Sequence, residues 1–108
     1  MLFDEYQEKA AEFASDDLPR EVALTVWALG LCGEAGEVAD HIKKHVGHGH
    51  PLNRDYIKKE LGDVLWYISA LSDWLDMSIE GIAIQNIDKL KARYPEGFSQ
   101  EASLNRVS

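Results

Sequence analysis

Cysteine and proline are scarce in this 108-residue sequence: cysteine occurs once, as Cys32, and proline three times. One cysteine excludes an intrachain disulfide, and this favours a reducing compartment. The first ten residues are acidic and interrupted by charges, which argues against a secretory signal, and no apolar run has the length of a bilayer span. We therefore expect a cytoplasmic protein without a membrane partner.

Basic residues are also scarce, with 11 Lys and Arg against 19 Asp and Glu, for a formal net charge of -8. A surface of this charge repels nucleic acid, so we expect no nucleic-acid partner. A small polyanionic substrate would be repelled as well, unless metal ions neutralise the acids that face it. The composition therefore links any such substrate to a metal requirement.

Strand signals are nearly absent, whereas apolar residues recur at helical spacing through the chain. The sequence predicts one all-α, four-helix-bundle-like domain over residues 1–108, with its core within 3–94 and a surface tail at 95–108. The expected helices cover residues 3–15, residues 20–46, a stretch capped by Asn53 that runs to 76, and a stretch capped by Ser78 that runs to 94.

The predicted bundle leaves apolar surface to be covered. Folding at this chain length buries only about two thirds of the unfolded surface, so partner chains often add stability. A helical wheel places Trp66, Val22, Val26 and Leu29 outside the main apolar stripes. We expect a homodimer or homotetramer to cover this second apolar surface.

Two short segments share the pattern acid, any residue, glycine, acid, valine: EAGEV at 34–38 and ELGDV at 60–64. The spacing i, i+3 places both acids of a pair on one helix face, about one turn apart. Each pair borders an apolar stripe on a helical wheel. When the two stripes pack together, four carboxylates can converge at one margin of the core: Glu34, Glu37, Glu60 and Asp63.

Converging carboxylates repel one another and lose hydration, which is tolerable only when a cation compensates. Ligands that offer only oxygen favour Mg²⁺, with Mn²⁺ also possible, and neither pair has the Glu-x-x-His pattern of di-iron bundles. The alternative is that these acids are solvated and paired with lysines. Because the two pairs match, we favour the metal site, and we expect Gly36 and Gly62 to allow close helix packing.

Three longer stretches follow one another along the chain: GEAGEVADHIKK, KKELGDVLWYISAL and NIDKLKARYPEGF. With Glu34-x-x-Glu37 and Glu60-x-x-Asp63, this ordered set resembles the all-α nucleoside triphosphate pyrophosphohydrolases of the MazG type. The resemblance implies that the four acids are catalytic and bind Mg²⁺, and that a nucleoside or deoxynucleoside triphosphate is hydrolysed to the monophosphate and pyrophosphate. Many relatives have a further glutamate where this chain has Gly33, which leaves the general base open between a motif glutamate and a water activated by the metal.

Candidate substrate-binding residues lie on the last predicted helix and after the first acid pair. Asn86, Lys89 and Arg93 border the apolar stripe of that helix, where they can contact phosphates. Lys43 and Lys44 occupy positions that lie near the phosphates in similar proteins. The alternatives are a solvated helix edge for the first three and charges that favour a helix C-terminus for the two lysines.

Aromatic and histidine side chains near the motifs allow two further interpretations. Trp27, Tyr67 and Trp74 flank the carboxylate margin and can stack on a base, although helical spacing of aromatics is more typical of a core, and we assign Trp27 to the core. The histidines of the 45–50 loop can bind zinc, although exposure to solvent is the more usual role of such a cluster.

Two other functions stay open. One is a helical interaction module of the same fold that needs no metal and binds a partner through the surface around Trp66. The other is hydrolysis of a different nucleotide phosphoanhydride.

Overall fold

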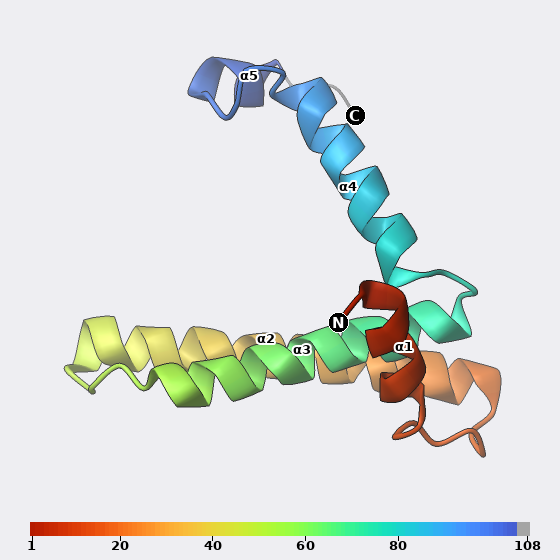
Figure 1. Cartoon of the computed structure of the whole chain (residues 1–108). Helices are drawn as coiled ribbons and strands as arrows, with labels where there is room; N and C mark the ends of the chain where they lie inside the picture. Colours follow the sequence, from red (N-terminus) through yellow and green to blue (C-terminus); the bar gives the residue numbers. More distant parts are fainter. Residues whose placement is uncertain (106–108) are drawn as a thin grey trace.

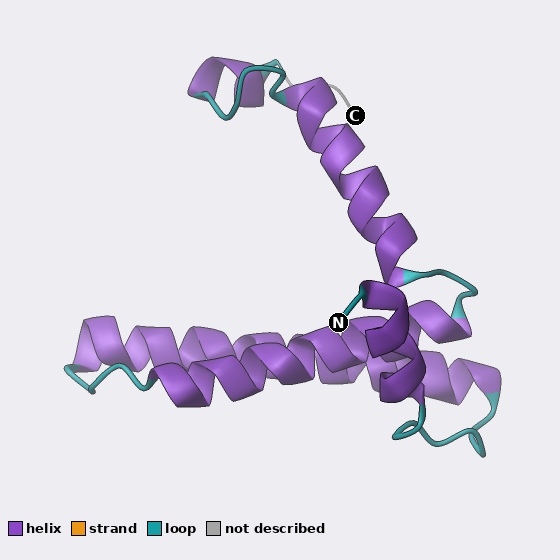
Figure 2. Cartoon of the chain, in the orientation of Figure 1, coloured by secondary structure: helices purple, strands orange, loops and turns teal. Residues whose placement is uncertain are grey.

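The computed structural model describes residues 1–105, which form helices and loops without a strand (Figure 1, Figure 2). The helices are α1 (Phe3–Ala11), α2 (Arg20–His48), α3 (Arg54–Trp74), α4 (Ile79–Arg93) and α5 (Gln100–Leu104). This arrangement confirms the all-α fold class that the sequence predicts. Residues 106–108 of the expected tail lie outside the described part of the chain.

Side-chain hydrogen bonds from two cap residues fix where α3 and α4 begin, and a glycine fixes where α2 ends. Asn53 Oδ1 accepts a hydrogen bond from the backbone N–H of Tyr56 at 3.0 Å, and the Ser78 side chain caps the start of α4 in the same way. Both caps confirm the expectation from sequence. Gly49 ends α2 because its φ of 71° lies in the left-handed region, where glycine has no steric penalty.

Two segments differ from the prediction. The first helix ends at Ala11 rather than at residue 15, because the amides of Phe13 and Ala14 bond three residues back, at 3.1 and 3.2 Å, and tighten the chain into a turn. The expected tail contains the short helix α5, whose first turn is capped by Ser99 Oγ accepting from the Ala102 amide at 3.0 Å. Five residues are too few for a hydrophobic period to reveal such a helix.

Helices α2 and α3 lie antiparallel along each other and form the body of the molecule (Figure 1). Ala23, Trp27 and Ala70 are buried between them. The burial of Trp27 confirms its assignment to the core. A large apolar side chain buried in this way stabilises the folded state by about 1.5–3 kcal/mol.

Helix α1 crosses one end of this hairpin and covers Trp66. The indole Nε1–H of Trp66 donates to the backbone carbonyl of Ala10 at 3.1 Å, and its ring meets Trp27 edge to face with centroids 5.3 Å apart. The prediction that Trp66 belongs to an outer apolar surface is therefore wrong, because a helical wheel cannot show which neighbouring helix packs on a face. The other three residues of the same predicted surface, Val22, Val26 and Leu29, are exposed.

The close approach between α2 and α3 occurs at Gly30 rather than at the motif glycines. A Cβ atom at Gly30 would overlap the ring of Tyr67, whereas one at Gly36 or Gly62 would meet nothing within 4 Å. The expectation that Gly36 and Gly62 allow close packing within the chain is therefore wrong. Gly30, outside both acid motifs, has that role.

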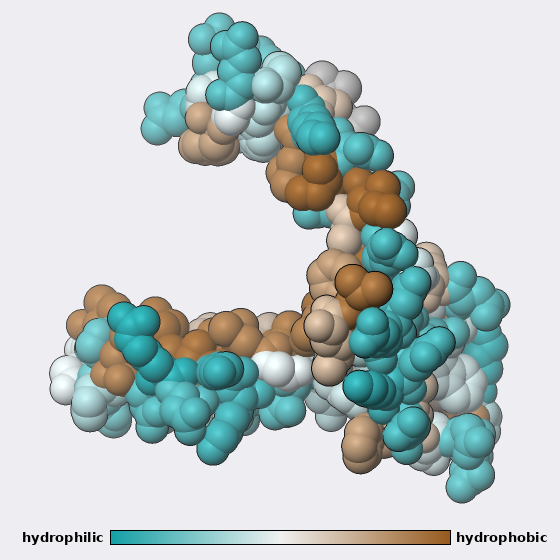
Figure 3. Space-filling model, in the orientation of Figure 1, coloured by the Kyte–Doolittle hydropathy of each residue, from teal (hydrophilic) through white to brown (hydrophobic). Residues whose placement is uncertain are grey.

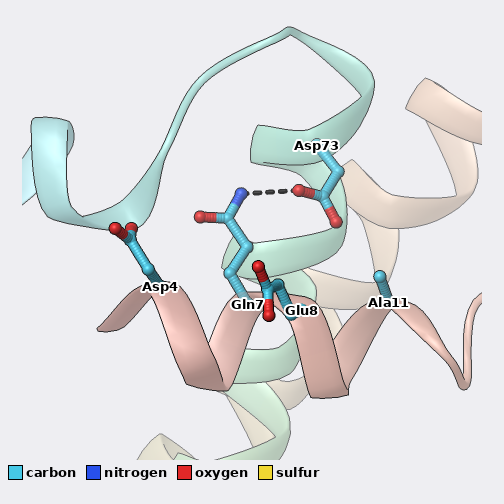
Figure 4. A pocket seen from close by; sticks show the side chains of 5 residues that line it. All are labelled: Asp4, Gln7, Glu8, Ala11 and Asp73. Carbon is cyan, nitrogen blue, oxygen red and sulfur yellow. Dashed lines mark hydrogen bonds between the residues drawn. The ribbon is translucent and has the colours of Figure 1, made fainter. Parts of the chain in front are cut away.

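One side chain of α1 ties the start of α4 to the rest of the fold. Gln7 is buried, and its Nε2 donates both to Asp73 and to the backbone carbonyl of Met77, the latter at 2.9 Å. Its Oε1 accepts from the amide of Ile79, the first residue of α4, at 2.9 Å. Figure 4 shows Gln7 reaching from α1 toward Asp73 at the end of α3. This single amide therefore joins α1, α3 and the start of α4.

Beyond this joint, α4 leads away from the hairpin and carries α5 at its far end (Figure 1). The radius of gyration is 16.9 Å, whereas a compact chain of this length has about 13 Å. Ile84, Ile87 and Phe98 are 57%, 50% and 74% exposed. Figure 3 shows hydrophobic surface on α4 and along the edge of the hairpin that faces it. One chain therefore does not close the predicted bundle by itself.

Helix α2 is long and apolar enough to cross a membrane, by length and composition alone. The expectation that no segment reaches this length is therefore wrong for α2. Interior helices of soluble bundles satisfy the same two criteria, so this property does not identify a membrane protein.

Candidate metal centre

Three of the four predicted acids meet where the two motifs lie beside each other on the α2–α3 hairpin. Glu34 of α2 and Glu60 and Asp63 of α3 each offer a carboxylate oxygen, and these oxygens all lie within 4.8 Å of one another. Glu34 and Glu60 are half-buried, while Asp63 is exposed. The antiparallel pairing of α2 and α3 thus brings acids that are distant in sequence to one margin of the core, as the helical spacing predicts.

Mutual repulsion within this group changes the ionisation of Glu34. The pKa of Glu34 is raised from 4.5 to about 7, first by a hydrogen bond with Glu60 and then by desolvation and by the charges of Glu60, Asp63 and Glu37. Near neutral pH, a proton therefore resides between two carboxylates in a substantial fraction of molecules. A divalent cation at the same place would neutralise more charge, and the all-oxygen donor set suits Mg²⁺ or Mn²⁺.

The fourth predicted acid, Glu37, lies one turn further along α2 and outside this group. Its Oε2 accepts a hydrogen bond from the hydroxyl of Tyr56 at 3.0 Å. That bond, with desolvation and the charge of Glu37 as smaller causes, raises the pKa of Tyr56. The sequence contained a signal for Tyr56, because it precedes Glu60 by four residues and so lies on the same face of α3.

A second tyrosine near the acids was also missed from sequence. Burial raises the pKa of Tyr6, with a further contribution from the charge of Asp63. Helix α1 therefore brings Tyr6 within electrostatic reach of the site. Because Tyr6 belongs to a different helix, no spacing rule within α2 or α3 could have indicated it.

Lys43 and Lys44 both pair with Asp40 on their own helix. Their Nζ atoms lie 3.2 and 2.9 Å from its two carboxylate oxygens, and these hydrogen bonds, that of Lys44 first, lower the pKa of Asp40. The hydrogen bond to Asp40 raises the pKa of Lys44, to which the charge of Glu37 also contributes. Lys44 thus lies within electrostatic reach of the acids, but exposed ion pairs of this kind contribute little stability.

The predicted phosphate contacts of α4 do not reach the acids within one chain. Asn86 and Lys89 are exposed and Arg93 is half-buried, all on the helix that leads away from the hairpin (Figure 1). The expectation that these side chains border the same core as the acids is therefore not met inside a single chain. The reason is that α4 leads away from the hairpin beyond the joint at Gln7 (Figure 1).

The loop histidines make local hydrogen bonds instead of a metal group. His45 Nδ1 lies 2.7 Å from the carbonyl oxygen of His50, and the ring centroids of His48 and His50 are 6.3 Å apart. Over residues 1–105, these imidazoles do not form a group of three ligands like that of the acids. The zinc interpretation of this loop gains no support from the geometry.

Residues 24–98 match the MazG nucleotide pyrophosphohydrolase domain, a span that contains both acid motifs and all of α3 and α4. The chain belongs to the MazG nucleotide pyrophosphohydrolase family. This confirms the resemblance seen in the three ordered sequence stretches.

The chain is similar to the Gene 37 protein of Mycobacterium phage L5, with 34% identity over 98% of this chain and 100% of that protein. The printed name of this relative states no activity. No solved structure matches the chain. The substrate and the metal of this MazG-family member are therefore argued from its own residues.

Proposed function

We propose that this protein hydrolyses nucleoside or deoxynucleoside triphosphates to the monophosphate and pyrophosphate in a reaction that depends on Mg²⁺, with Mn²⁺ as a substitute. The observation that carries this proposal is the meeting of Glu34, Glu60 and Asp63 within 4.8 Å, in a member of a nucleotide pyrophosphohydrolase family. Three acids in contact need a counter-charge, and the cation that supplies it also attracts a polyphosphate.

The four motif acids would hold the cation, Glu37 joining the three that already meet. When bound, the metal supplies charge neutralisation for the triphosphate and for the pyrophosphate that leaves. The protein's own contribution is to fix the carboxylates before the substrate arrives, since α2 and α3 are paired along their length.

The reaction requires a water oxygen to form a bond to the α-phosphorus, in line with the bond from that phosphorus to the bridging oxygen, which breaks. The electron pair of the broken bond leaves with pyrophosphate. A motif carboxylate accepts the proton of the water.

We also propose that a second copy of the chain completes the site. Ile84 and Ile87 of α4 are exposed. Helix α4 leads away from the hairpin and carries Asn86 and Lys89 with it (Figure 1). In a two-fold dimer, α4 of one copy would cover the hairpin of the other and bring its polar edge to the phosphates. This places Asn86, Lys89 and Arg93 at the substrate in trans.

The central experiment is a panel of nucleoside and deoxynucleoside triphosphates, assayed for pyrophosphate and monophosphate with and without Mg²⁺. We expect release of both products only with the metal. Asp63→Ala should lower the rate at least about 100-fold. Removing a residue that only hydrogen-bonds to a metal ligand already lowers metal affinity or activity by up to that factor. Circular dichroism should show unchanged helix content.

The panel separates the alternatives. A non-catalytic module predicts no pyrophosphate from any member and no Mg²⁺-dependent rise in melting temperature. Cleavage confined to added dinucleotides or nucleotide-linked metabolites would replace the triphosphate substrate with another phosphoanhydride.

Mixing two inactive variants tests the shared site. Asp63→Ala and Lys89→Ala chains, unfolded together and refolded, should recover up to about a quarter of the wild-type rate, because a mixed two-fold dimer keeps one intact site. If Lys89 served the acids of its own chain, the mixture would stay inactive.

A further inference from the structure

Four side chains tie the start of α3 to the second half of α2. The backbone N–H of Asn53 donates a hydrogen bond to His41 Nε2 at 3.0 Å, and the side-chain Oδ1 of Asn53 accepts one from the backbone N–H of Tyr56 at 3.0 Å. The rings of His41 and Tyr56 lie 5.1 Å apart at 34°. The hydroxyl of Tyr56 then donates to Glu37 Oε2 at 3.0 Å. Tyr56 is therefore held at its backbone, at its ring and at its hydroxyl.

This arrangement limits where the Glu37 carboxylate can lie. Tyr56 has only two rotatable side-chain torsions, and its ring is already fixed against His41. On α3, Tyr56 lies one turn before Glu60, and on α2, Glu37 lies one turn after Glu34. The pair Tyr56–Glu37 is therefore the next layer along the hairpin from the pair Glu34–Glu60.

The electrostatics of the site explain why such a restraint is needed. Glu34, Glu60 and Asp63 already meet, and the charge of Glu37 adds to the repulsion that Glu34 experiences. An exposed glutamate in this field lowers its energy by turning toward bulk water. A neutral hydroxyl donor opposes that movement without adding charge to the cation site.

We infer that Tyr56 is a positioning residue, which holds Glu37 one turn from the three-acid group so that its carboxylate is ready to join them around the cation. This inference rests on the proposed function, because it assigns Tyr56 to the same metal centre. Hydrogen-bonded partners of metal ligands typically change metal affinity by 10–100-fold when they are removed. Tyr56 is such a partner, because its hydroxyl donates a hydrogen bond to Glu37 Oε2.

The test is a titration with Mn²⁺ alone, without nucleotide, followed by electron paramagnetic resonance. Tyr56→Phe removes only the hydroxyl and should raise the Mn²⁺ dissociation constant about 10-fold, with unchanged circular dichroism. Tyr94→Phe removes a hydroxyl at the end of α4, which contributes no acid to the cation group, and should bind Mn²⁺ as the wild type does in the absence of nucleotide. Unchanged affinity in Tyr56→Phe would overturn the inference.

A double-variant cycle shows whether Tyr56 acts through Glu37. Glu37→Gln should weaken Mn²⁺ binding by itself, and adding Tyr56→Phe to it should cause little further loss, because the bond between the two side chains is already compromised. Independent, additive losses would overturn the positioning role even if each variant binds less well.

The outcomes separate this inference from the proposed function. A wild-type chain that binds no Mn²⁺ contradicts both. A wild-type chain that binds Mn²⁺, loses affinity on Tyr56→Phe and yet releases no pyrophosphate from any triphosphate contradicts the proposed reaction and supports the role of Tyr56.

Discussion

At the scale of single residues, Glu34 makes the metal-free protein sensitive to pH. Its pKa is raised from 4.5 to about 7, first by the hydrogen bond with Glu60. Between pH 4.5 and about 7, Glu34 therefore carries a proton more often in the folded state than in the unfolded state. The corresponding stabilisation is complete below pH 4.5 and is lost as the pH rises through about 7.

Glu34→Gln should remove this dependence because the amide does not titrate. We expect the variant to gain stability relative to the wild type as the pH increases from 5 to about 8, in urea unfolding with a chelator present. Added Mg²⁺ should reverse the order at the higher pH, since only the wild type keeps all the carboxylates. Parallel pH profiles for the two proteins would contradict the assignment.

Gly30 is the residue whose small size the helix packing requires. An added methyl group would overlap the Tyr67 ring, which is itself packed against Trp66 with centroids 5.2 Å apart. Gly30→Ala should therefore lower the free energy of unfolding by about 1–3 kcal/mol, even though alanine favours a helix. Urea denaturation measures this change.

Gly36→Ala is the matched control on the same helix, because nothing lies within 4 Å of the added carbon. We expect it to raise stability by up to about 1 kcal/mol from helix propensity. A loss of stability at Gly36 in the isolated chain, equal to that at Gly30, would contradict the packing described for α2 and α3.

At the scale of helices, Gln7 decides how α4 is attached. Gln7→Ala removes three hydrogen bonds and leaves the amide of Ile79 without its partner. We expect a loss of about 2–4 kcal/mol in the free energy of unfolding. Amide hydrogen exchange at Ile79 should become faster than the loss of global stability explains. Exchange in the middle of α2 should become faster only by the amount that the lower free energy of unfolding predicts. Gln85→Ala, at an exposed position of α4, should alter neither quantity.

Much of the secondary structure was predictable because its signals are local. The caps at Asn53 and Ser78 act within four residues of their helices, and the i, i+3 acid pairs depend only on helix geometry. This geometry places each acid pair on one face of its helix, so Glu34 meets Glu60 and Asp63 where α2 packs against α3.

The remaining features depend on contacts between helices, for which one sequence holds no local signal. The burial of Trp66 requires α1 to cross the hairpin, and the outward course of α4 requires Gln7 to reach it. Tyr56 was within reach of a spacing argument through Glu60, but its bond to Glu37 follows from the register of α2 against α3.

At the scale of the whole molecule, the apolar side of α4 should drive association. Ile87 is 50% exposed on this helix. Ile87→Asp should convert the proposed dimer to a monomer, as measured by light scattering, because burying the new charge without a partner costs several kcal/mol. Gln85→Asp adds the same charge at an exposed polar position of α4 and should leave the assembly intact.

The bond from Gln7 to the Ile79 amide joins positions 72 residues apart in the sequence. During synthesis, α1 leaves the ribosome long before its partner at the start of α4 has been made. The attachment of α4 can thus be completed only after Ile79 has been made, so it depends on a contact between segments that are distant in the sequence.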